Sequence, residues 1–176
     1  MKTYQPITPE IIEKLKAITG PTYVKTDRDM LLQYQTDYET NPAMFHVPDA
    51  AVSPANAQEI SEIVKLANEY DFPITVRSGG TSLADGAIPV CGGLVLCMDR
   101  LNKILELNEE GMYMTVEAGV RTVDLQNAAK KVGLMYAGDP SSAESSLIGG
   151  NLATNAGGLR AVRYGCLLYT SPSPRD

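Results

Sequence analysis

The sequence has few of the residues that metal centres and hydrolases need. Its 176 residues include no tryptophan, one histidine (His46) and three cysteines without CxxC spacing, which are Cys91, Cys97 and Cys166. So few soft ligands disfavour a zinc site, and a Ser-His-Asp triad would have to use His46, which stands in a predicted loop near Pro48. We predict reduced thiols and no metal centre, with a redox-active pair of Cys91 and Cys97 as the less favoured alternative.

Long apolar runs and excess basic charge are also lacking. The longest apolar stretches, such as GGLVLCM, are far shorter than the roughly 20 residues that span a bilayer, and the N-terminal MKTYQPITPE has no secretory signal core. A net charge of -6 argues against a nucleic-acid partner. We expect a cytoplasmic protein without a transmembrane segment, and peripheral attachment to the inner membrane is left open.

The residues that are present favour a folded core of alternating elements. Hydrophobic residues make up 44% of the chain and charged residues 20%, as in globular proteins. Thr8 and the proline after it predict a helix over residues 8–18. A second helix is expected to begin near Thr26, where Asp29 three positions later suggests a capping box. Residues 37–48 read as a loop.

A strand, a helix and a strand follow from residue 49. DAAVSP and PITVR are β-prone, and Asn56 is placed to cap a helix that runs through Tyr70. This order predicts one βαβ unit. The helical spacing of apolar residues predicts a core face made of the following residues: Ile60, Ile63, Val64 and Ala67.

Three short strands are predicted next, from LVLCM, KILELN and MYMTVEAG. A turn at residues 109–111 joins the last two into an antiparallel hairpin. A further helix is expected to open at Arg121 or Thr122 and to end at Gly133, a residue suited to a C-terminal cap. Helices that alternate with strands, together with a hairpin, indicate a mixed α+β or α/β domain.

The first glycine-rich segment is ITVRSGGTSLADGAIP, over residues 74–89. Gly79 and Gly80 can adopt positive φ, so that backbone N–H groups converge on an anion without side chains in the way. Arg77 would add a positive charge, or its side chain caps a surface. The pattern indicates a phosphate cradle, with an ordinary glycine turn as the alternative.

The second segment is GDPSSAESSLIGGNLATNAGGLRAVRYG, over residues 138–165. We predict a long functional loop whose small residues let the backbone lie against a planar ring, while Asn151 and Asn155 hold it through their amides. The interleaved leucines and isoleucine disfavour a flexible linker. Neither segment is a GxGxxG fingerprint opening a helix, a GxxxxGK[ST] loop or a GxSxG elbow.

In this order and at this separation, the two segments resemble the PCMH-type FAD-binding domain of vanillyl-alcohol oxidase, D-lactate dehydrogenase and the FAD-linked subunit of glycolate oxidase. The resemblance covers about residues 1–165. It implies an α+β fold, in which a small βαβ subdomain is followed by the start of an antiparallel-sheet subdomain with helices. The implied divisions are an N-terminal helical segment (1–45) and an incomplete FAD-binding domain (46–165).

The last residues depart from that family's pattern. LLYTSPSPRD has no periodicity and contains two Ser-Pro pairs, where the family continues into another strand. We expect residues 166–176 to be a non-native tail, with a native surface tail as the alternative.

The resemblance also implies which residues hold the cofactor. Those around the pyrophosphate would be Arg77, Ser78, Gly79, Gly80, Thr81 and Ser82, with Gly86 and Ala87 close by. Those that follow on the flavin side would be Pro140, Ser141 and Ser145. Those lining the flavin and adenosine would be Gly149, Gly150, Asn151, Thr154, Asn155, Gly157 and Gly158, with Tyr164 and Gly165 closing the motif. Relatives with covalently bound flavin carry a histidine after the paired glycines, where this chain has Thr81, so noncovalent FAD is implied.

In that family the flavin accepts a hydride from a small 2-hydroxy acid such as glycolate or D-lactate, which becomes the 2-oxo acid. Electrons then leave through a partner subunit or a quinone. The substrate domain would lie beyond the end of this chain, so no catalytic residue is named. A noncatalytic FAD-binding module or fragment and a UDP-sugar reductase of the same fold stay open as alternatives, although NLATNAGGLRAVRYG resembles the hydroxy-acid group more closely.

Overall fold

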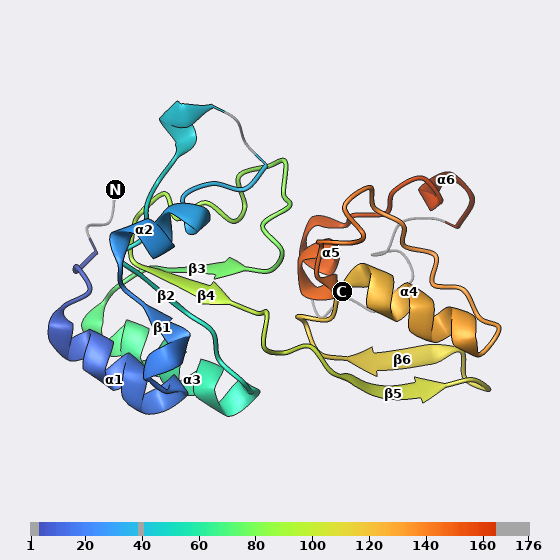
Figure 1. Ribbon diagram of the computed structural model, residues 1–176, viewed down its shortest axis with the longest axis horizontal. Coiled ribbons are helices and arrows are strands. Elements are labelled where there is room, and N and C mark those ends of the chain that lie inside the picture. The colour runs from blue at the N-terminus through green and yellow to red at the C-terminus, as the bar shows by residue number, and fades with distance from the viewer. Residues whose placement is uncertain (1–3, 39–40, 165–176) are drawn as a thin grey trace. The chain divides into compact units, whose positions relative to one another are not determined.

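The computed structural model describes residues 4–38 and 41–164, which form two compact units, Met1–Arg100 and Leu101–Asp176. Each unit has its own sheet, as Figure 1 shows. The mixed α+β fold predicted from the sequence is confirmed.

The first unit contains a four-stranded sheet in the order β1-β2-β4-β3. Its strands are β1 (Val24–Lys25), β2 (Ala50–Val52), β3 (Ile74–Arg77) and β4 (Leu94–Cys97). Its helices are α1 (Pro9–Thr19), α2 (Arg28–Leu31) and α3 (Ala57–Tyr70), with 3-10 turns at Pro21–Tyr23, Leu32–Tyr34 and Pro42–Met44. Strands β2 and β3 both pair in parallel with β4, so β2, α3 and β3 form the predicted βαβ unit, and β1 pairs antiparallel with β2.

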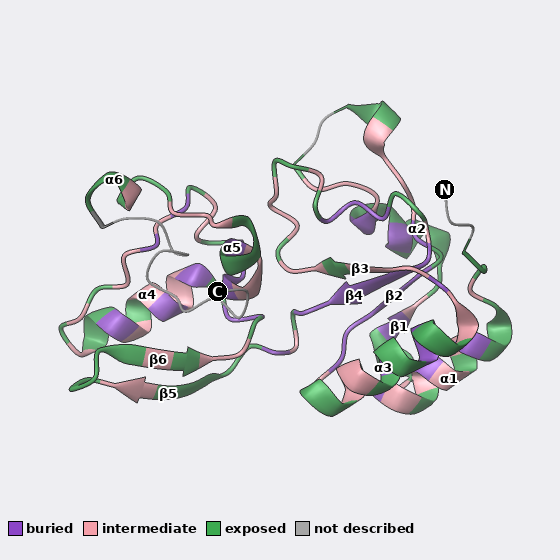
Figure 2. Cartoon of the chain, turned by 180° about the vertical axis from the view of Figure 1, so that it is seen from behind, coloured by how far each residue is buried: buried purple, intermediate pink, exposed green. Residues whose placement is uncertain are grey.

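Helices cover both faces of this sheet. Helices α1 and α3 lie on one face and α2 on the other, so that β2 and β4 are buried throughout their length (Figure 2). Strands buried on both faces read as continuous apolar runs, as AAV and LVLC do here. Side chains of alternate strand residues meet α2 and the turn after it in a cluster of Leu31, Tyr34, Ala51, Val95 and Cys97.

Local hydrogen bonds fix the helix starts in this unit. Thr8 accepts from the N–H of Ile11 at 3.4 Å, and Asn56 accepts from the N–H of Glu59 at 2.9 Å, as their positions predicted. The cap of α2 was predicted wrongly. The side chain of Asp27, and not that of Thr26, accepts the N–H groups at the start of α2, because a carboxylate one position closer to the helix has the better reach and favours the positive helix end.

The core face of α3 was also predicted only in part. Ile63 and Ala67 are buried as expected, whereas Val64 is 41% exposed and Leu66 is buried at 7%. Both apolar positions fit a helical period, so only the direction in which α3 packs on the sheet separates them.

The second unit pairs a hairpin with helices. Strands β5 (Ile104–Asn108) and β6 (Tyr113–Val116) are antiparallel, as predicted, and the helices are α4 (Thr122–Lys131), α5 (Ile148–Thr154) and α6 (Ala161–Tyr164). Val120, Leu125 and Ile148 form its core cluster, with Met114 and Val116 of β6 packed against it. Gly133 follows the end of α4 with φ of +75°, which confirms the predicted glycine cap.

The second glycine-rich segment is not one continuous loop as expected, because α5 and α6 lie within it. The N–H groups of Ile148 and Gly149 donate to the carbonyls of Val120 and Ala118, at 2.8 and 2.9 Å. A Cβ on Gly149 would stand 2.9 Å from that of Ala118. These tertiary contacts hold a glycine-containing helix that intrinsic propensity disfavours. Among the described helices, none is long and apolar enough to cross a membrane.

Candidate functional site

The first glycine-rich segment leaves β3 and forms a loop with unpaired donors. Among the residues that the structure describes, the N–H groups of Gly79, Gly80, Thr81 and Ser82 meet no protein acceptor. Gly80 has φ of +65°, whereas Gly79 does not take the positive φ expected of it. Backbone donors without a protein partner in a glycine turn are suited to bind an anion.

Arg77 ends β3 at the base of this loop. Its Nη1 donates to the carbonyl oxygen of Thr36 at 2.8 Å. Burial lowers the pKa of the guanidinium, while the titratable groups of Cys97, Asp37 and Tyr34 act in the opposite direction. A positive charge, partly shielded from water, therefore lies at the base of the predicted phosphate cradle.

Ser82 joins the loop to the segment before β2 and also forms a bond within the loop. The carbonyl of Ser82 accepts from the N–H of Tyr38 at 3.1 Å, and the Oγ of Ser82 accepts from the N–H of Ala84 at 3.1 Å. Asp85 has φ of +57°, Gly86 follows it, and Ala87 is buried. Ser78 and Thr81 are half-buried. The first group of predicted cofactor residues thus lies within one loop of the first unit.

The second segment closes on itself. The N–H of Asp139 donates to the carbonyl of Gly157 at 3.0 Å, and Asp139 pairs with Gly158 in an isolated parallel bridge. A Cβ on Gly158 would overlap the carbonyl of Asp139 and lie 2.6 Å from the nitrogen of Pro140. The φ of Gly158 is +75°. Glycine is therefore required at residue 158 by the protein's own backbone, whatever the segment binds.

Side chains reinforce the same contact. Asp139 accepts from Gln126 Nε2 at 3.0 Å through Oδ1, and Arg160 Nε lies 3.2 Å from its Oδ2. Gln126 Nε2 also donates to the carbonyl of Gly138 at 2.9 Å. Helix α4 thus holds one end of the segment.

Asn151 belongs to a buried polar network. Its Nδ2 donates to Thr122 Oγ1 at 2.5 Å, and that oxygen lies 2.9 Å from Ser146 Oγ. Asn151 is 4% exposed, Thr122 0% and Ser146 1%. Buried polar groups are costly unless hydrogen-bonded, so this network fixes α5 against the start of α4. The flavin contact implied for Asn151 stays a prediction.

The other predicted residues of this segment occupy turns and helix ends. Pro140 is buried, Ser141 and Ser145 are exposed, and Gly149 and Gly150 lie in the first turn of α5. Thr154 Oγ1 donates to the carbonyl of Gly150 at 2.9 Å, and Asn155 caps α5 with φ of +55°. Tyr164 ends α6, and Gly165 lies outside the described residues, as does the predicted tail of residues 166–176.

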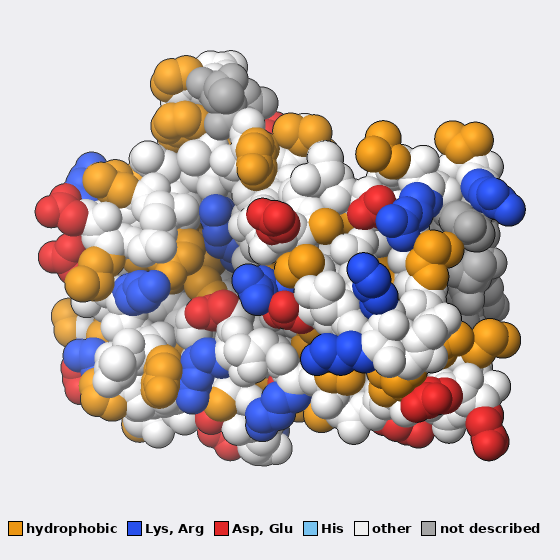
Figure 3. Space-filling model, turned by 45° about the vertical axis from the view of Figure 1, so that its right-hand side comes forward, with side chains coloured by type: hydrophobic (Ala, Val, Ile, Leu, Met, Phe, Trp, Pro, Cys, Tyr) orange, Lys and Arg blue, Asp and Glu red, His pale blue; other side chains and the backbone are white. Residues whose placement is uncertain are grey.

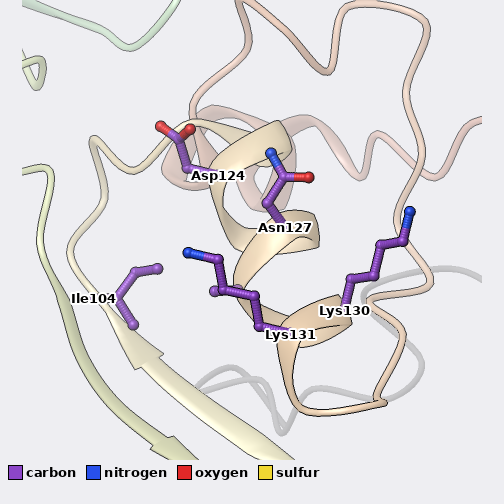
Figure 4. A pocket seen from close by; sticks show the side chains of 6 residues that line it. Ile104, Asp124, Asn127, Lys130 and Lys131 are labelled. Carbon is purple, nitrogen blue, oxygen red and sulfur yellow. The ribbon is translucent and has the colours of Figure 1, made fainter.

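A separate hollow of about 660 Å³ lies beside α4. Figure 4 shows its lining side chains, which come from α4 apart from Ile104 at the start of β5. The lining residues are Ile104, Asp124, Asn127, Ala128, Lys130 and Lys131. None of these six is a predicted cofactor residue. Basic, acidic and apolar side chains are interspersed on the face drawn in Figure 3.

The described residues offer donors for an anion and little acid–base chemistry. Within residues 4–38 and 41–164, no group of three or more His, Cys, Asp or Glu could hold a metal ion. Burial raises the pKa of Cys97, which favours its thiol form. The arrangement is suited to binding an anion such as a phosphate group.

Several residues that shape the site were not found from the sequence. Tyr34 and Thr36 hold Arg77, Thr122 accepts from Asn151, and Ser146 in turn bonds Thr122. Tyr34, Thr36 and Thr122 lie far along the chain from the glycine segments that they support, whereas Ser146 lies within the second segment. Their local sequence contains no signal for these contacts, because the contacts exist only after folding.

The sequence and structure were compared with known proteins. Residues 48–169 match the protein family described as an FAD binding domain. The chain is 41% identical over 159 residues to glycolate oxidase subunit GlcD of Bacillus subtilis (strain 168), covering 90% of this chain and 33% of that protein. It is 35% identical over 166 residues to a D-lactate dehydrogenase of Anaerostipes hadrus, covering 93% and 34%. The chain spans about a third of the length of the curated relatives it matches.

The fold also agrees with that of a solved structure. A structure of alkyldihydroxyacetonephosphate synthase matches with a TM-score of 0.81 and 27% identity, covering 92% of this chain and 35% of the neighbour.

Proposed function

This chain belongs to the FAD binding domain family, and on that premise we propose that it is the cofactor-binding front part of a flavin-dependent 2-hydroxy-acid oxidoreductase. The proposed reaction oxidises a small 2-hydroxy acid, such as glycolate or D-lactate, to the 2-oxo acid. The loop after β3 carries this proposal, because its unpaired N–H groups and the cation below them suit the pyrophosphate of FAD. The names of two relatives, a glycolate oxidase subunit and a D-lactate dehydrogenase, support the substrate class.

The described residues fit an FAD held without a covalent bond. When bound, the flavin supplies the acceptor for the substrate's hydride. The first unit's part is to hold the diphosphate at Gly79–Ser82, and the flavin contacts implied for residues 138–158 are part of the same proposal. Thr81 stands where covalently flavinylated relatives carry a histidine, which supports noncovalent binding. The cofactor contacts implied for the other residues stay proposals, each within its own unit.

The wider setting is also part of the proposal. Residues that receive the hydroxy acid would lie in a further domain, electrons would leave through a partner subunit or a quinone, and the protein would act in the cytoplasm, at most peripheral to the inner membrane.

Residues 166–176 are proposed to be non-native, although the family match continues to residue 169. The nucleotide sequence downstream of the Gly165 codon in the source genome tests this, and a continuation that encodes LLYTSPSPRD would contradict it.

Two experiments test the function in turn. Purified protein should carry flavin absorbance bands, and heat or acid should release intact FAD, because the bond is not covalent. A colourless protein that does not take up added FAD would refute cofactor binding.

The protein with its genomic continuation should then reduce an artificial electron acceptor with glycolate or D-lactate. Flavin binding without turnover of any 2-hydroxy acid would instead support a noncatalytic FAD-binding module.

A further inference from the structure

The guanidinium of Arg77 lies directly against the turn at Gly80. A Cβ built on Gly80 would overlap Nη2 of Arg77 and stand 2.5 Å from Cζ and 2.8 Å from Nε. Gly80 also has φ of +65°, which L side chains rarely adopt. The backbone of the loop therefore rests on the guanidinium, and the position of each depends on the other.

The guanidinium of Arg77 is held by contacts with Tyr34 and Thr36, in the segment before β2. Besides its hydrogen bond to Thr36, it lies over the ring of Tyr34, with Cζ 5.7 Å from the ring centroid. Tyr34 is only 7% exposed, and its hydroxyl accepts from Lys25 Nζ at 2.6 Å. The N–H of Tyr38 meets the loop itself at the carbonyl of Ser82. The glycine loop is thus joined to this segment both directly and through the guanidinium.

The charge on this guanidinium is not neutralised by a direct ion pair. Among the described residues, no carboxylate forms a salt bridge with Arg77. Asp37 acts on the guanidinium only through space, and a partly desolvated cation gains from an anion placed nearby. The loop that Arg77 contacts at Gly80 carries N–H groups that meet no acceptor among the described residues. Lysine would supply the same charge as a point, without the plane that contacts both Tyr34 and Gly80.

We propose that Arg77 is a positioning residue for the cofactor: its guanidinium, seated on Tyr34 and the Thr36 carbonyl, holds the Gly80 turn in the conformation that receives a diphosphate. The inference deepens the proposed FAD function and rests on it. Tyr34 thereby becomes part of the cofactor site without touching the cofactor.

The first test compares two arginines that are seated alike. Cζ of Arg100 lies 3.4 Å from the centroid of the Tyr23 ring, and Nη1 donates to the carbonyl of Ser53 at 2.7 Å and lies 4.0 Å from Glu59 Oε2. Among the described residues, it forms no hydrogen bond with the loop. In the protein with its genomic continuation, Arg77→Lys should weaken FAD binding by about tenfold or more, a coupling typical of residues in direct contact. Arg100→Lys should leave FAD affinity unchanged, even if both variants lower the melting temperature of the FAD-free protein. An Arg77→Lys variant that binds FAD as the wild type does would overturn the inference, because charge alone would then suffice.

The second test substitutes Tyr34 and Gly80. Its Tyr34 variants stay decisive if Arg77→Lys does not fold. Tyr34→Leu removes the ring that supports the guanidinium, whereas Tyr34→Phe keeps the ring and removes the hydroxyl with its hydrogen bond from Lys25. Only Tyr34→Leu should therefore weaken FAD binding. In a double-mutant cycle, Gly80→Ala should cost less affinity in the Arg77→Lys background than in the wild type, since the steric overlap is relieved while the φ strain stays. Equal effects of the two Tyr34 variants, or strict additivity, would contradict the inference. Wild-type protein that fails to bind FAD would instead refute the proposed function.

Discussion

Substituting alanine at Gly158 should unfold the second unit more readily, even without FAD. The new Cβ would overlap the carbonyl of Asp139, a backbone group that cannot swing away as a side chain can. Two costs add. The left-handed φ of +75° costs about 1–2 kcal/mol for an L residue, and parting the backbones breaks the hydrogen bond from Asp139 to Gly157, worth about 1 kcal/mol. We expect a loss of about 3 kcal/mol, or about 6–12 °C in melting temperature for a chain of this size.

A second glycine separates these two costs. Gly133 has the same φ of +75°, but nothing lies within 4 Å of the position of its Cβ. Gly133→Ala should therefore show the φ cost alone, about 1–2 kcal/mol. The assay is urea unfolding of the FAD-free protein, followed by circular dichroism. Equal destabilisation by the two substitutions would refute the argument that close backbone approach, and not φ alone, requires Gly158.

Three further predictions concern groups in other parts of the fold. Asn151→Ala should destabilise the protein by about 2–3 kcal/mol, because it leaves the buried Thr122 hydroxyl without its donor; the exposed Asn127→Ala is the control, and equal melting temperatures would contradict the network. Asn56→Ala should cost about 1 kcal/mol through loss of the α3 cap, whereas Asn68→Ala on the exposed face should be neutral or slightly stabilising; similar urea midpoints would count against the cap. Burial raises the pKa of Cys97 in the folded state. The buried thiol therefore stabilises the fold fully at a pH below the unfolded pKa of about 8.5, and this stabilisation declines as the pH rises above that value. The free energy of unfolding should therefore fall more steeply between about pH 8 and pH 10 in the wild type than in Cys97→Ala, and parallel slopes would exclude this linkage.

Much of the first unit could be predicted from local patterns, although strand β1 and the 3-10 turn at Pro42–Met44 were not. The caps Thr8 and Asn56 and the strands on either side of α3 are where the sequence placed them, since a cap bonds an N–H only three residues away. The N-cap of α2 is Asp27 and not the neighbouring Thr26. Both residue types can cap a helix, so the backbone path into α2 decides between them. Val64, predicted to face the core, is exposed, and Leu66, for which no prediction was made, is buried. The packing angle of α3 decides which of them faces the sheet.

The sequence by itself determined where glycines and small hydroxyl residues gather and which family they indicate, because composition and order along the chain carry that information. Only the tertiary structure decided what the individual residues do. It packs Gly158 against the backbone of Asp139 and hydrogen-bonds the buried side chain of Asn151 to Thr122. It also places the ring of Tyr34 beside the guanidinium of Arg77. Each of these pairs joins residues at least a dozen positions apart, whose meeting depends on sheet register and helix packing that no local pattern records.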